Sequence, residues 1–416
     1  MTIQRAVSRT LIGSALAASA AACSNKFLEV TNPNVLDAST VDPAAAAATL
    51  AATTQQNFAT ELGITAMFES HFTGETYIIE TSSPQNEFGK REVSVDNGTL
   101  LGRWTGLELA AASGKILLDL NLPSPATDVN VARAAAFRAY AILYLAIDFC
   151  SATLSSGPEL STTQLLDSAT FWFSKAIAVG NANGTADGMA LANVARVGRA
   201  RAELQKGDKA AALADANAVP AGFVFNLAYQ DDLTNRTRLS NAYWRFTVDR
   251  GTVSVPPYYQ TGDPRTPFLP PGKHPYVAVD QAAGPFYIQQ KFTSYAAPIR
   301  LASKLEAEYI RVEASGDVGA QVALINQQRA AANQPAYAGP SDAASVLYEL
   351  FTQKALDFWL EGKRMADWRR QPVAASGNVP VTGSAYWRTG FGSVGSQTCY
   401  PLPRPETDNN PNFKHP

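Results

Sequence analysis

The stretch that decides the fold class is VARAAAFRAYAILYLAIDF, residues 131–149. Its Arg138, Ile142, Leu145 and Phe149 follow one another at steps of three and four, which is the spacing of one face of an α-helix. Alanines occupy much of the remainder, so that a neighbouring helix can approach closely. The stretch therefore predicts a long helix with helical neighbours.

Helices of the same kind are predicted on both sides of this stretch. Residues 165–179 repeat the pattern, residues 191–205 follow, and a short alanine-rich helix covers 209–218. Brief Gly-Asp turns at 207–208 and 316–317 separate successive helices. Small helix faces, antiparallel pairs and short turns are typical of a tetratricopeptide-like stack, and the lack of the full repeat signature predicts an irregular one. Further helices are predicted over 43–62, 100–120, 301–314, 318–332 and 343–368.

Two segments, 63–99 and 221–300, have a different character. Repeated prolines such as Pro256-Pro257 and Pro270-Pro271 break any long helix in the second segment, and aromatic residues are dense there. We expect long loops with a few short strands. Loops longer than about 15 residues in a compact domain are usually functional or disordered, and the aromatic content argues against disorder. The tail, 371–416, is rich in Gly and Pro and is expected to wrap the surface.

The composition argues against several classes of function. The 416 residues are 46% hydrophobic and 10% aromatic, which fits a globular fold with a sizeable core. The formal net charge is −2 and no basic patch stands out, so nucleic-acid binding is not expected. The three histidines are not spaced with other ligands as a metal site requires, and we predict no metal and no cofactor. The stretch GFGSVG, residues 390–395, has a dinucleotide-binding spelling but lacks the strand before it and the helix after it, so it is interpreted as a glycine loop.

The N-terminus has the three parts of a secretory signal. A positively charged start precedes a short apolar stretch, and three alanines stand directly before Cys23. We therefore predict a lipoprotein signal peptide over 1–22, acylation of Cys23 and an extended tether over 23–42. An ordinary signal peptide with a chance cysteine is the alternative, because Ala20 stands where lipoproteins usually carry leucine.

The two remaining cysteines, Cys150 and Cys399, form a candidate pair. A chain exported to an oxidising compartment can join them in a disulfide. The alternative is two separate buried thiols, since the Cα separation that a bridge requires is not visible in a sequence.

Four groups of motifs, spread nearly end to end, resemble one family. The first is Cys23 with Phe27-Leu28 and Asn32-Pro33; the second is Phe137-Arg138-Ala139-Tyr140 with Arg201-Ala202-Glu203-Leu204 and Gly207-Asp208. The third is Asp263-Pro264-Arg265, Lys291, EAEYIRVEA at 306–314 and INQQR at 325–329; the fourth is EGKRMADWRR at 361–370 with PLPRPE at 401–406 and Asn409-Asn410-Pro411. In this order and spacing they resemble the SusD/RagB-like outer-membrane lipoproteins, the nutrient-binding partners of TonB-dependent transporters.

The resemblance implies a single SusD-like domain over 43–416, behind the tether. Its expected parts are the helical stack (43–62, 100–220 and 301–370), a loop-rich ligand region (63–99 and 221–300) and the wrapping tail (371–416). It also implies a non-enzymatic protein, anchored by lipid to the outer membrane and facing the cell surface. Such a protein captures an oligosaccharide, another glycan or a peptide and delivers it to a TonB-dependent, SusC-like transporter. Gln353-Lys354 and Asp357 depart from the family pattern and weaken the assignment to a subgroup.

The charged residues at the end of the last predicted helix are interpreted as structural. Glu361, Arg364, Asp367 and Arg370 recur at steps of three beside Gly362, which suits a packed ion-pair network. A catalytic role is the alternative interpretation.

Ligand-binding candidates are aromatic and planar polar residues in the loop-rich region that look exposed, since sugar C–H faces stack on aromatic rings and sugar hydroxyls bind polar groups. They are Tyr77, Phe88, Trp244, Tyr258, Tyr259 and Tyr287, with Asn86, Asp249 and Arg250 as polar neighbours. Packing in the core or in the loops is the alternative for each.

Two other functions stay open at this point: a surface hydrolase acting on polysaccharide, and a helical-repeat scaffold without a small ligand. The chain has many acids, but a sequence does not show the carboxyl separation that glycoside hydrolysis requires. It has no serine-nucleophile elbow and no His-Glu-x-x-His, so no catalytic residue is assigned. The aromatic-rich loops count against a scaffold.

Overall fold

The structure is a computed structural model that describes residues 42–413. The predicted signal peptide, Cys23 and all but the last residue of the predicted tether lie outside the described residues. Within 42–413, no helix is both long and apolar enough to cross a bilayer. The elements described next belong to the unit that begins at Ala47, apart from residues 43–46 at the start of the first helix.

Helix α5 (Val129–Asp148), formed by the stretch that predicted the fold class, is buried on every side. Asp128 caps its first turn by accepting a hydrogen bond from the Asn130 N–H. From Val131 onward every residue of the helix is buried except Arg133. A helix enclosed in this way forms the core of a domain rather than its surface.

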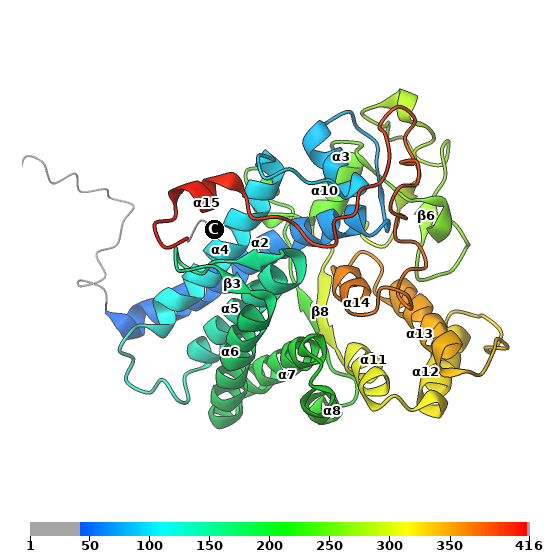
Figure 1. Cartoon of the computed structure of the whole chain (residues 1–416). Helices are drawn as coiled ribbons and strands as arrows, with labels where there is room; N and C mark the ends of the chain where they lie inside the picture. Colours follow the sequence, from blue (N-terminus) through cyan, green and yellow to red (C-terminus); the bar gives the residue numbers. More distant parts are fainter. Residues whose placement is uncertain (1–41, 414–416) are drawn as a thin grey trace, which may run out of the picture. The chain divides into compact units, whose positions relative to one another are not determined.

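The other helices stack outward from α5 in chain order (Figure 1), so the predicted irregular tetratricopeptide-like stack is confirmed. α4 and α6 pack on α5, α7 packs on α6, α8 on α7, α11 on α8, and α13 on α12. The turns after α6, α7 and α11 each place a glycine in the left-handed region, at Gly184, Gly207 and Gly316. The helices are α4 (Gly98–Leu118), α6 (Thr162–Asn183), α7 (Ala186–Lys206), α8 (Lys209–Ala218), α11 (Lys304–Ser315), α12 (Val318–Ala331) and α13 (Ala343–Asp357).

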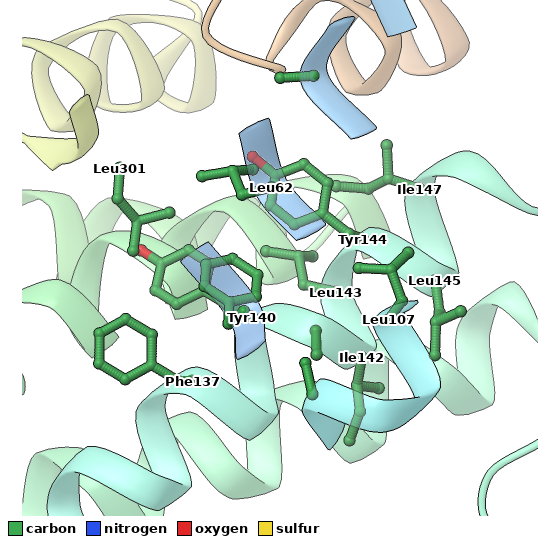
Figure 2. Packing of buried hydrophobic residues seen from close by; sticks show 14 of the residues in the cluster. Leu62, Leu107, Phe137, Tyr140, Ile142, Leu143, Tyr144, Leu145, Ile147 and Leu301 are labelled. Atoms are coloured by element: carbon green, nitrogen blue, oxygen red, sulfur yellow. The ribbon is translucent and has the colours of Figure 1, made fainter. Parts of the chain in front are cut away.

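The main core is built around the large side chains of α5. Figure 2 shows Tyr140 and Tyr144 of α5 in this core together with Leu62, Leu107 and Leu301, which come from other elements. Smaller clusters continue it between α7, α8 and α11 and between α11, α12 and α13. The stack is thus held by apolar contact from each helix to the next.

The loop-rich region contains short antiparallel strand pairs and short helices. The pairs are β1 (Tyr77–Ile78) with β5 (Val253–Ser254), β4 (Val224–Leu227) with β8 (Ile299–Ser303), and β6 (Phe268–Leu269) with β7 (Ile288–Gln289). A further antiparallel pair, β2 (Ser151–Ala152) with β3 (Leu160–Ser161), lies in the stack between α5 and α6. The short helices are α9 (Arg236–Leu239), α10 (Ala242–Val248), η2 (Pro257–Tyr259) and η3 (Gln281–Ala283). The β4–β8 pair leads directly into α11 and so connects this region to the stack.

The predicted loop over 63–99 is wrong in two places. The first helix, α2 (Pro43–Phe72), continues beyond Leu62, because Met67, Phe68 and Phe72 are buried and extend its apolar contacts. A second helix, α3 (Ser83–Lys90), follows. Phe72, at the end of α2, is fully buried.

The last predicted helix, 343–368, is interrupted. α13 ends at Asp357, and α14 (Arg364–Arg370) begins only after a turn in which Leu360 and Gly362 both have positive φ, 62° and 65°. A Cβ at Gly362 would lie 2.8 Å from the Ala66 Cβ, so this turn packs closely on α2. The turn moves Glu361 off the helix and into a buried cluster of charges.

Glu361 accepts hydrogen bonds from three cations. Its carboxylate lies 2.7 Å from the Lys291 Nζ, 2.9 Å from an Arg300 guanidinium nitrogen and 3.2 Å from the Lys363 Nζ. Burial raises the pKa of Glu361, but the attraction of Lys291, Lys363 and Arg300 outweighs it and lowers the pKa. Lys363 also pairs with Glu306, at 3.2 Å.

Arg364, Asp367 and Arg370, the other three residues of the predicted network, have other partners than Glu361 has. Asp367 pairs with Lys354 at 2.7 Å and with Arg370 at 2.9 Å. Arg364 donates instead to the Phe351 carbonyl and to the Asn378 side chain. The four residues spaced by three are therefore not one network, because the interruption before α14 takes Glu361 off the helical face.

The tail is fastened to the end of α5. A disulfide joins Cys150 and Cys399, with a Cα–Cα distance of 5.1 Å. The Cys150 N–H donates to the Tyr400 carbonyl, and the Tyr400 N–H donates to the Asp148 carbonyl. The short helix α15 (Arg404–Asn409) follows.

Glu361→Ala is expected to lower the free energy of unfolding by about 3–5 kcal/mol, because it leaves buried cations without their shared anion. Urea unfolding followed by circular dichroism measures the change. The matched control is Lys115→Ala, which removes an exposed pair with Asp119 and should have a much smaller effect. Equal effects of the two variants would contradict the structural role of Glu361.

Replacing both Cys150 and Cys399 by serine is expected to lower the free energy of unfolding by about 2–4 kcal/mol, because the bridge closes a long loop in the unfolded chain. Hydrogen exchange should also speed up at the Tyr400 amide, which the bridge holds against Asp148. Unfolding of the wild-type protein with and without reductant is the companion measurement. Identical midpoints in the two conditions would show that the bridge does not stabilise the fold.

Candidate functional site

A partly enclosed cavity of about 280 Å³ lies where four segments of the chain meet. They are the end of α2 with β1, the end of α3, the segment of η2, and the tail. The volume is near the lower end of the range of roughly 300–1,000 Å³ for ligand pockets. Its lining residues are His71, Gly74, Thr76, Tyr77, Gly89, Pro256, Tyr258, Asn378, Pro380, Ser384, Ala385, Tyr386, Trp387 and Val394.

Aromatic rings form much of the lining. Tyr77 and Trp387 are stacked in parallel, with ring centroids 4.4 Å apart and an interplanar angle of 4°. Tyr386 lies beside Trp387, at 5.9 Å between centroids, and its hydroxyl contacts the Asn86 side chain at 3.3 Å. Tyr258 is partly exposed at another part of the lining. Such rings present flat apolar faces with polar edges, which suits a ligand of mixed polarity.

Buried contacts hold these lining segments in place. The Trp359 indole N–H donates to the Glu75 carbonyl at 3.2 Å, and its ring stacks on Tyr259 at 5.5 Å. The Asn378 amide donates to the Tyr259 hydroxyl at 2.7 Å and to the Gly74 carbonyl at 3.3 Å. The tail segment of Asn378 is thereby joined to the chain that leads into Tyr77.

His71 carries an unpartnered polar atom of the lining. Its side chain is almost fully buried, and burial lowers its pKa to about 3, so the ring is neutral. Nδ1 lies 2.7 Å from the Thr76 hydroxyl, while Nε2 has no hydrogen-bond partner among the described residues. Unpaired buried polar atoms are unusual in proteins and call for an explanation.

No Asp, Glu, Lys or Arg is among the described residues that line the cavity. Charged residues next to lining residues in the sequence include Lys90, which pairs with Glu92 at 2.6 Å, and Arg388, which pairs with Asp280. The lining therefore lacks the pair of carboxyl groups that glycoside hydrolysis uses. In residues 42–413 there is also no group of three His, Cys, Asp or Glu side chains that could hold a metal ion.

Only two of the ligand candidates predicted from the sequence, Tyr77 and Tyr258, line this cavity. Tyr259 is fully buried behind it. Phe88 is fully buried against Phe68 and Tyr400, because α3 turns it inward. These last two were wrongly expected to be exposed.

The remaining candidates lie outside the cavity lining. Asn86 is buried and donates to the Glu80 and Ser82 carbonyls. Trp244 packs edge-on against Tyr276, and Tyr287 packs edge-on against Phe268. Asp249 accepts a hydrogen bond from Tyr295, and Arg250 pairs with Glu80. The structure does not bring these residues together into one site.

The sequence analysis missed the lining residues of the tail, above all Tyr386 and Trp387, and also His71. The adjacent aromatic pair at 386–387, within a Gly-rich stretch, was the available signal. The tail was expected only to cover the surface, so this pair is not among the predicted ligand residues. His71 is not among the predicted ligand residues, because the helix that carries it, α2, was expected to end at Leu62.

Comparison with solved structures shows that the chain has the fold of SusD-like proteins. A SusD superfamily protein from Parabacteroides distasonis is 16% identical, with a TM-score of 0.65 over 90% of this chain and 99% of that one. A laminarin-binding SusD-like protein is 16% identical, with a TM-score of 0.64 over 88% of this chain and 98% of the other. A SusD-like carbohydrate-binding protein from Bacteroides vulgatus is 15% identical, with a TM-score of 0.61 over 81% and 84%. The chain matches no family model and no curated protein. The resemblance predicted from the motifs is thus confirmed at the level of the fold.

Three buried carboxyl groups make stability depend on pH. Burial raises the pKa of Glu75 to about 8. Burial, with repulsion from Asp148, raises the pKa of Glu69, and burial raises the pKa of Asp148. Each group keeps its proton in the folded state at a pH where the unfolded chain has released it. For each group, the free energy of unfolding should therefore fall by about 1.4 kcal/mol per pH unit. This applies while the pH lies between the pKa of the group in the unfolded chain and its higher pKa in the folded protein.

We expect the protein to be more stable at pH 5.5 than at pH 8, measured by urea unfolding at both values. Glu75→Gln should reduce this difference, because it removes one of the titrating groups. The control Glu92→Gln, at a half-exposed position, should leave the difference unchanged. Stability that rises between pH 5.5 and pH 8 would have the wrong sign for buried neutral carboxyls.

Proposed function

We propose that this protein is a non-enzymatic glycan-binding protein that holds its ligand at the cavity of Tyr77, Tyr258 and Trp387. The observation that carries the proposal is the aromatic lining without charged side chains. Aromatic faces suit the C–H faces of a sugar ring, and polar side chains of the lining such as Asn378 and Ser384 suit its hydroxyls. The fold supports the proposal, since solved proteins of the same fold include ones described as laminarin-binding and carbohydrate-binding.

The predicted lipid anchor extends this proposal to the cell surface. Acylation of Cys23 would attach the protein to the outer membrane, and the segment up to residue 42 would serve as its tether. From there it would capture a glycan and deliver it to a TonB-dependent transporter. Capture needs no bond-breaking chemistry, which agrees with a lining without carboxyl groups.

Replacing Tyr77 and Trp387 together by Ala is expected to weaken binding of the glycan at least tenfold, because stacking is lost on both rings. Affinity electrophoresis against a panel of soluble polysaccharides, followed by calorimetry with the best one, measures this change. The control is Phe171→Ala, which removes an exposed ring on α6 that is not part of the cavity lining. Unchanged affinity in the double variant would place the ligand elsewhere, and no binding to any glycan would contradict the proposed function.

A further inference from the structure

A second pocket, of about 570 Å³, is lined by α13, the loop before it and the segment after α14. Its volume falls within the range of roughly 300–1,000 Å³ for ligand pockets. Two apolar or aromatic side chains of its lining are well exposed, Tyr348 at 44% and Val373 at 82%. The one charged side chain of its described lining, Glu349, is paired with Arg329 at 2.6 Å. The pocket thus offers accessible contact area and no unpaired charge of its own.

One stretch of the tail lines both this second pocket and the cavity of Tyr77. Ala374 belongs to the lining of the second pocket, and Asn378, four residues later, belongs to the lining of the cavity. Four residues of fully extended chain span at most about 14 Å. The Ala375 N–H donates to the Gln371 carbonyl at 2.8 Å, so the stretch turns and its ends lie closer than that limit. The two openings are therefore neighbours.

Two partly exposed tyrosines stand between them. Tyr258 lines the cavity, with 37% of its surface exposed, and Tyr348 lines the second pocket. A Cβ at Gly377 would lie 3.1 Å from the Tyr258 hydroxyl and 3.3 Å from the Tyr348 hydroxyl. A side chain at this position would therefore fill the gap between the two hydroxyls, and glycine leaves it open.

Buried hydrogen bonds fix the width of this gap. The Arg364 guanidinium donates to the Asn378 side chain at 3.0 Å and to the Phe351 carbonyl of α13 at 3.4 Å. The Asn378 amide donates in turn to the hydroxyl of Tyr259, the neighbour of Tyr258 in the chain. Arg364 is almost fully buried, so it acts through these groups and not by touching a ligand. A path held in place before binding lowers the entropic cost of ordering it around a ligand.

We infer that the second pocket is a further subsite for the same glycan, whose chain runs from the cavity past Tyr258 and Tyr348 toward Val373. The inference rests on the proposed glycan-binding function and adds the length of the ligand, a chain of several sugars. Aromatic rings along one path suit a sugar polymer, because each ring offers a flat apolar face to a different unit. The shared stretch of tail and the open gap at Gly377 favour this occupant over a separate protein partner, which would need neither.

The dependence of affinity on ligand length tests the inference with the intact mature protein. The probes are oligosaccharides of two to six sugars, prepared from whichever of starch, xylan, galactomannan, β-glucan and pectin binds best. Calorimetry is expected to show at least tenfold tighter binding of the hexasaccharide than of the disaccharide. Equal affinities would overturn the inference and leave glycan binding at the cavity intact. Binding to none of the five polysaccharides would contradict the proposed function, and the inference with it.

Two variants assign the gain in affinity to the second pocket. Tyr348→Ala removes a ring of the path, and Gly377→Leu fills the gap; each should lower the ratio of hexasaccharide to disaccharide affinity at least fivefold. Phe171→Ala, which removes an exposed ring on α6 outside both linings, is the control and should keep the wild-type ratio. Thermal unfolding checks that the variants fold, and Tyr348→Ala, at an exposed position, decides the outcome if Gly377→Leu does not. A wild-type ratio in folded Tyr348→Ala would exclude the second pocket from glycan binding and leave it to a protein partner.

Discussion

The buried carboxylate of Glu361 is the group on which the arrangement of stack and loops depends. The Glu361 carboxylate forms ion pairs with Lys291 of the loop-rich region, Arg300 of β8 and Lys363 of the turn before α14. Lys363 continues the cluster to Glu306 of α11. Burying a charged side chain costs free energy unless its partners of opposite charge are also in place. The loop-rich region, β8, α11 and the turn before α14 are therefore stable together only in the arrangement that keeps these charges paired.

The same cluster supports the cavity from behind. The Lys291 Nζ also donates to the Trp359 carbonyl, at 2.5 Å. Trp359 in turn holds the Glu75 carbonyl and stacks on Tyr259, whose hydroxyl accepts from Asn378 in the tail. A chain of direct contacts therefore runs from the charged core to two of the segments that line the cavity. Binding surfaces are most specific when a rigid scaffold positions them in this way.

The core contains many charged side chains, whereas the lining of the cavity has none among the described residues. Within the core, anions are compensated by cations or, as for Glu69 and Asp148, have raised pKa values. The lining carries no charged side chain among the described residues, and aromatic rings such as those of Tyr77 and Trp387 form much of it. Flat aromatic faces of this kind are the feature on which the proposed glycan binding rests.

The sequence by itself determined the helical stack, because the apolar spacing of 131–149 and the Gly-Asp turns act locally along the chain. It also offered Tyr77 and Tyr258 as ligand residues. Only the tertiary structure decided that Glu361 leaves its helix, that Cys150 meets Cys399 and that Trp387 stacks on Tyr77. Each of these contacts joins segments far apart in the chain. The positions of these residues depend on how the chain turns, as at Gly362, and on how distant segments pack. A local pattern of residues does not encode the turn or the packing.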